Sequence, residues 1–167
     1  MRLLGPLSLT LAAGGILYSA TYHPWGFLQT AWGGRIKGIE AWDHGLDSGK
    51  LFGVGTADIK HFIPIGFVCL VAVGGWLRAG KVLSVPLWLM ILLSAYATYH
   101  TAWNVWFFAS GTAVRLTGPR SLSCWPGMGS YLAVGSSLLS MMTCVVMAVW
   151  CRRAAPAASL VQDPAGL

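Results

Sequence analysis

Residues 61–109 read HFIPIGFVCLVAVGGWLRAGKVLSVPLWLMILLSAYATYHTAWNVWFFA. The stretch contains two long apolar runs, about 61–77 and 82–109, and neither run carries an Asp, Glu, Lys or Arg. Because about 20 apolar residues in a helix cross the core of a bilayer, each run is predicted to span a membrane. Only the four residues Arg78 to Lys81 separate the runs, so the two helices must be antiparallel neighbours.

Two further uncharged runs flank this hairpin, at about 3–22 and about 124–151. The sequence therefore predicts an all-α membrane protein, an antiparallel four-helix transmembrane bundle formed by one domain over residues 1–153. The other segments are a long first outer loop, a shorter second outer loop and a flexible C-terminal tail, at 23–60, 110–123 and 154–167. The pattern leaves open whether the long loop forms a small β-sheet, a surface helix or both.

Composition supports a membrane location. Of 167 residues, 56% are hydrophobic and only 10% are charged, with a mean hydropathy of +0.64, whereas a soluble domain carries about a quarter charged residues. Water-soluble enzymes, disordered chains and DNA-binding domains are therefore excluded. The net charge of +6 comes from cations that occur singly or in pairs, and nucleic-acid binding needs a basic patch, so no nucleic acid is expected as a partner.

Tryptophans and cations at the ends of the runs indicate the orientation of the chain. Indole rings prefer the headgroup boundary, and tryptophans occur at both ends of the predicted spans: Trp25, Trp103, Trp106 and Trp125 on the loop side, and Trp76, Trp88 and Trp150 on the turn side. The cations closest to the spans lie on the turn side: Arg2, Arg78, Lys81, Arg152 and Arg153. Because positive charge near span ends favours the cytoplasm, we expect a multi-pass protein with both termini cytoplasmic.

The spans carry few groups for chemistry. An ionisable side chain inside the membrane is the usual mark of a transport or proton path, and the four runs contain no carboxylate, lysine or arginine. No nucleophile elbow, HExxH, CxxC or phosphate-binding glycine loop occurs. Gly127-Met128-Gly129 has no strand pattern before it and is not counted as a nucleotide loop. We therefore expect a non-enzymatic protein with no catalytic residue and no cofactor.

The histidines provide the competing hypothesis. His23, His61 and His100 all fall on the loop side of the predicted bundle. Neutral imidazole is the commonest transition-metal ligand, so three converging rings would bind copper or zinc, or ligate haem. The simpler reading is that histidine, like tyrosine, settles at the membrane interface. No pair has a tight ligand spacing such as HxH, and both readings stay open.

Cys151 and the small residues of the spans suggest further contacts. Cys151 stands beside Arg152 at the membrane edge, a position suited to reversible palmitoylation, although an unmodified interfacial cysteine is an equal alternative. Small residues recur at four-residue spacing, as at Gly15 and Ser19 or Ser136 and Ser140. This spacing lets helices approach closely in lipid. It predicts packing within the bundle, with a homo-oligomer face as the alternative.

This layout resembles the claudin and peripheral-myelin-protein superfamily of four-span proteins. Short patches match at Trp25, Gly45-Leu46, Lys60, Ala97-Thr98-Tyr99 and Gly129-Ser130-Tyr131-Leu132. Asp47 stands where the family's loop motif has tryptophan, and the paired loop cysteines that pin a small outer sheet in the family are missing. The resemblance implies lateral association in the membrane, cell contact, or assistance to a larger channel or receptor.

The expected function is therefore that of a structural or accessory subunit, with the lipid bilayer and other membrane proteins as partners. The predicted docking surface is a group of loop-side tryptophans, a residue type that is enriched at interface hot spots: Trp25, Trp32, Trp42, Trp103 and Trp106. The alternative is a metal- or haem-binding redox subunit that uses His23, His61 and His100. A ligand pocket between the helices is a third possibility.

Overall fold

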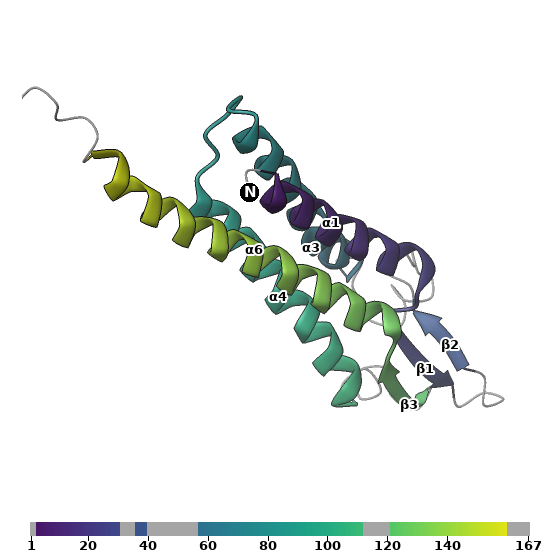
Figure 1. Cartoon of the computed structure of the whole chain (residues 1–167). Coiled ribbons are helices and arrows are strands. Elements are labelled where there is room, and N and C mark those ends of the chain that lie inside the picture. The colour runs from purple at the N-terminus through teal and green to yellow at the C-terminus, as the bar shows by residue number, and fades with distance from the viewer. Residues whose placement is uncertain (1–2, 31–35, 40–56, 112–120, 160–167) are drawn as a thin grey trace, which may run out of the picture.

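The computed structural model describes residues 3–30, 36–39, 57–111 and 121–159, and it describes side chains within 3–29, 62–111 and 123–152. These residues form four long helices and three short strands. The helices are α1 (Leu4–Tyr22), α3 (Ala57–Ala79), α4 (Leu87–Ala109) and α6 (Met128–Ser159), and the strands are β1 (Gly26–Thr30), β2 (Ile36–Ile39) and β3 (Ser121–Pro126). The helices lie side by side, and the strands sit together at one end of them (Figure 1).

Three of the helices are long and apolar enough to cross a membrane: Leu4–Tyr22, Phe62–Ala79 and Met128–Arg152. This is the character expected of an integral membrane protein. The fourth helix, α4, contains no charged residue, but Thr98, His100, Thr101 and Asn104 make its second half polar, and it is not among the three.

Several predicted boundaries were wrong. The fourth helix begins at Met128, not at Cys124, because residues 121–126 pair with β1 as strand β3. The third helix begins at Leu87, not at Val82. The preceding residue, Pro86, is extended, and a proline disfavours the helical conformation in the residue before it. Residues 154–159, predicted as part of a flexible tail, continue α6.

The helices form a closed ring in chain order, in which α1 packs on α3 and α6, and α4 packs on the same two helices. Neighbours run antiparallel. Gly5 near the start of α1 approaches Met147 in the second half of α6, whereas Gly15, farther along α1, approaches Ser136 near the start of α6. A Cβ atom at Gly15 would lie only 2.5 Å from Ser136 Oγ, so the small residues at these positions permit the close α1–α6 contact that their spacing predicted.

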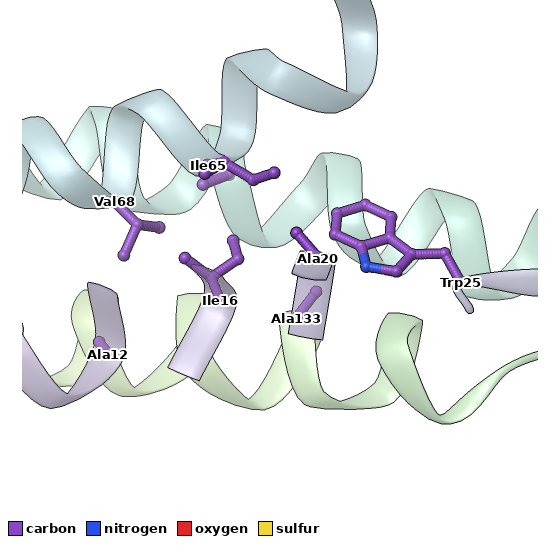
Figure 2. Packing of buried hydrophobic residues seen from close by; sticks show 8 residues of the cluster. Ala12, Ile16, Ala20, Trp25, Ile65, Val68 and Ala133 are labelled. Atoms are coloured by element: carbon purple, nitrogen blue, oxygen red, sulfur yellow. The ribbon is translucent and has the colours of Figure 1, made fainter. Parts of the chain in front are cut away.

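The core has an apolar side and a hydroxyl-rich side. Ile16, Val68 and Ala97 belong to an apolar cluster between the helices, and Figure 2 shows the side chains of Ile16 and Val68 pointing toward one another. Between α4 and α6, the hydroxyls of Ser94 and Ser140 lie 2.9 Å apart, as do those of Thr101 and Ser137. Such bonds join helices in lipid, where hydrophobicity supplies no drive for association.

The three strands form an antiparallel sheet in the order β2-β1-β3. Among the described residues, the long loop therefore contributes two strands and the second loop contributes one. The sequence had left open whether the long loop forms a sheet, and its described part does. The sheet holds to the bundle without a disulfide, since all four cysteines are free. Instead Cys124 Sγ donates to the carbonyl oxygen of Phe108 at 3.2 Å, and Leu28 of β1 packs on Phe108 at the end of α4.

Glycines at the start of α6 bond this helix to the turn between α1 and β1. The N–H groups of Gly127 and Gly129 donate to the carbonyl oxygens of Trp25 and Pro24, each at 3.0 Å. A Cβ at Gly129 would lie 2.6 Å from the carbonyl oxygen of His23, so only glycine permits this approach. A strand does precede Gly127, contrary to the sequence reading, but these amides are bonded to the chain itself. The two glycines therefore serve packing, not phosphate binding.

Candidate docking surface

The structure separates the tryptophans that the sequence grouped together. Trp103 and Trp106 are exposed at 48% and 51%, as a docking role requires. Trp25 is only 2% exposed, and its indole lies within the core beside Ala20 (Figure 2). The prediction that Trp25 belongs to the docking surface was therefore wrong, because the turn after α1 directs this ring inward. Trp32 and Trp42 lie outside the described residues.

Helix α4 divides into two faces along its length. Its buried residues follow spacings of three and four and include Met90, Ser94, Ala97, Thr101, Asn104 and Phe108. Apart from Leu89, its exposed large side chains follow the same spacing on the other side: Trp88, Leu92, Tyr96, Tyr99, Trp103 and Trp106. Residues three and four apart are neighbours on a helix surface, so the exposed set forms one continuous stripe, here termed the α4 face.

Within the α4 face the rings contact one another. The ring centroids of Tyr99 and Trp103 are 6.3 Å apart, and those of Trp103 and Trp106 are 4.7 Å apart. Tyr99 is the most exposed of the three, at 64%. Since the rings already support one another, a partner would meet a preformed aromatic ridge and would order few side chains on binding.

The sequence identified only the last two members of the α4 face. Tyr96, Tyr99 and Leu92 were not identified because tryptophan content directed the prediction, and Trp88 was assigned to the turn side of the membrane instead. The signal that finds them is the periodicity of α4, because large residues continue backward from Trp106 at spacings of three and four.

Two of the candidate metal ligands lie against aromatic rings. The His23 ring packs edge-on against Tyr18, with centroids 5.3 Å apart, and the His100 ring lies 6.1 Å from that of Tyr96. Among the described residues no group of three His, Cys, Asp or Glu side chains is placed to hold a metal ion. The side chain of His61 lies outside them, so convergence of the three histidines stays a prediction.

Cys151 is exposed on α6, with its sulfur 3.7 Å from Nη2 of Arg78. Its exposure leaves the thiol accessible, and palmitoylation stays a prediction.

Comparison of the chain with known proteins does not assign it to a family. No family model matches the sequence, and no curated protein matches it significantly. The chemistry of the site therefore rests on its own geometry, which is that of an exposed aromatic helix face on an apolar helical bundle.

Proposed function

We propose that this chain is a non-enzymatic integral membrane protein with four transmembrane helices, which acts as a structural or accessory subunit through lateral contacts with other membrane proteins. The partner we propose is a transmembrane helix of another protein that lies along the α4 face. The termini are proposed to be cytoplasmic.

Packing supports α4 as the fourth span. With 23 residues, α4 is about 35 Å long at 1.5 Å per residue, which exceeds the thickness of about 30 Å of a hydrocarbon core. It closes the ring between α3 and α6, so a membrane that contains those two helices also contains α4. Four antiparallel spans place both ends of the chain on the same side, in agreement with the approach of Gly5 to Met147.

The observation that carries the proposal is the α4 face. Aliphatic side chains suffice for contact with lipid tails, and the outer surface of α6 between Tyr131 and Trp150 is of that kind, with Leu138, Leu139 and Val146 exposed. The outer surface of α4 instead presents Tyr and Trp along most of its length. Aromatic residues concentrate in interface hot spots, and in the membrane their O–H and N–H groups are best satisfied by partners on another helix.

The resemblance to the claudin and peripheral-myelin-protein superfamily leads to the same proposal. That layout implies helices joined by a long outer loop and a shorter outer loop that together carry a small sheet. The described sheet takes β1 and β2 from the first loop and β3 from the second. The role implied is association in the membrane, or assistance to a larger channel or receptor.

The experiment is site-specific photocrosslinking in native membranes. Benzoylphenylalanine replaces Trp106 in the α4 face, and a matched chain carries it at Trp150, an equally exposed tryptophan of α6 (51% and 53%). We expect an adduct of one defined mass from position 106 and none of that mass from position 150. The double variant Trp103→Ala, Trp106→Ala should then lose the partner during purification in mild detergent, whereas Trp150→Ala should keep it.

The proposal fails if position 106 crosslinks only to lipid, or if the two positions yield the same adducts. Native mass spectrometry of the same preparation tests the alternative function. A metal or haem mass that disappears in His23→Ala and His100→Ala variants would favour a redox subunit.

A further inference from the structure

The three cations whose side chains the structure describes all lie at the turn end of the bundle, opposite the sheet. Arg78 ends α3, Lys81 lies in the turn that follows, and Arg152 lies on α6. Lys81 and Arg152 are exposed, and Arg78 is partly buried. These three residues are here termed the basic end.

Arg78 holds the basic end together. Its Nη1 donates to the carbonyl oxygen of Val85 at 2.9 Å, and its Nη2 lies 3.7 Å from Cys151 Sγ. The guanidinium thus ties α3, the turn and α6 to one another beside Arg152. The N–H of Lys81 donates to the carbonyl oxygen of Arg78 at 3.1 Å, which fixes the backbone of Lys81 beside that of Arg78.

No carboxylate neutralises these cations among the described residues. The chain has five acidic residues, of which four lie in the 23–60 segment and the fifth is Asp163, outside the described residues. A guanidinium has five N–H donors in a rigid fork that matches phosphate, and the two contacts of Arg78 leave donors for an anionic ligand.

Tryptophans place the basic end at the level of lipid headgroups. Trp76 and Trp88 lie near the ends of α3 and α4 on this side, and Trp150 lies near the end of the apolar segment Met128–Arg152 of α6. The three side chains are exposed at 44%, 63% and 53%. Exposed indoles at helix ends prefer the headgroup region, so the cations beside them meet lipid phosphates in the bilayer.

From this charge and placement we infer that the basic end is a binding surface for the headgroups of anionic phospholipids. The ligand that it fits is a phosphate diester with net negative charge, and the leaflet that it selects is the anionic, cytoplasmic one. The inference requires membrane insertion but does not depend on a partner at the α4 face, so the two proposals fail separately.

The test uses the full chain reconstituted into bilayer nanodiscs of equimolar phosphatidylcholine and phosphatidylglycerol. After extraction in mild detergent, native mass spectrometry counts the lipids that stay bound. We expect phosphatidylglycerol to predominate on the unaltered chain. The variant Lys81→Gln, Arg152→Gln should reduce the ratio of bound phosphatidylglycerol to phosphatidylcholine by about fivefold for each cation removed. Arg78 is left in place because its bond to Val85 supports the turn.

A matched control removes the same charge from the opposite end of the molecule. Lys37→Gln, Lys60→Gln changes β2 and the first turn of α3 and should leave the lipid ratio unchanged. The inference is overturned if the basic-end variant keeps the ratio of the unaltered chain, or if the control lowers it equally, since net charge alone would then explain the preference. Circular dichroism shows that each variant is folded.

Discussion

Replacing Trp25 with alanine tests the division between core and surface on which the docking proposal depends. The indole is 2% exposed and belongs to the apolar cluster that also contains Ile16, Ile65 and Ala97. The cluster also contains Ala133 of α6, so the ring packs in a core shared by all four helices, next to the turn that leads into β1. Removing it leaves a cavity where α1 ends.

The cost follows from the packing contacts of the ring and from the cavity that its loss leaves. Measured truncations of buried Phe or Trp to Ala cost about 3–5 kcal/mol. We expect Trp25→Ala to lower the free energy of unfolding by about 4 kcal/mol. Trp103→Ala, which removes a 48% exposed ring, should change it by about 0.5 kcal/mol.

The assay is unfolding in dodecyl maltoside micelles by titration with sodium dodecyl sulfate, followed by circular dichroism. Both variants are compared with the unaltered chain under the same conditions. The reasoning is refuted if the free energy of unfolding of Trp25→Ala lies within about 1 kcal/mol of that of the unaltered chain, because the loss of a ring this deeply buried should cost more. It is also refuted if Trp103→Ala costs as much as Trp25→Ala.

Two further substitutions test the packing between helices. Gly129→Ala places a methyl group against backbone atoms and should cost about 1–3 kcal/mol, whereas Gly135→Ala, which meets open space, should be neutral or stabilising by up to about 1 kcal/mol; equal effects in the same titration would contradict this contrast. Ser94→Ala should cost about 0.6 kcal/mol, the usual worth of a hydroxyl bond between membrane helices. Because Ser94 and Ser140 share one hydrogen bond, the double variant Ser94→Ala, Ser140→Ala should lose less stability than the sum of the two single variants. Strictly additive losses in this double-mutant cycle would exclude the bond.

Much of the helical framework was predictable from the absence of charge. The runs at 3–22, 61–77 and 82–109 each coincide with most of one helix, because a long apolar segment satisfies its backbone in lipid only as a helix or in a closed barrel. The start of α6 was not predictable in this way. Cys124 and Trp125 are as apolar as the helix that follows, and only the register with β1, in which Phe27 pairs with Trp125, makes their segment a strand.

The candidate site was predicted in part. Trp103 and Trp106 are exposed, as a docking surface requires, and their docking role stays a prediction. Trp25 was misassigned because the residue type does not show whether a side chain points into the core or away from it. Its ring turns inward at the corner where the carbonyl oxygens of Pro24 and Trp25 accept hydrogen bonds from Gly129 and Gly127, a contact between segments about 100 positions apart in the chain.

The sequence by itself determined that the chain is helical and suited to a membrane, because hydropathy and the absence of charge act locally within each run. It also predicted the hairpin of α3 and α4 from the four residues between the two apolar runs, and the seven residues that connect the helices in the structure are still few enough to make them antiparallel neighbours. The tertiary structure decided which face of each helix is covered. Ser94 and Thr101 bond across to α6, and this turns the tyrosines and tryptophans of the α4 face outward. Helix periodicity marks two faces on α4, and only the positions of its neighbours determine which of them is buried.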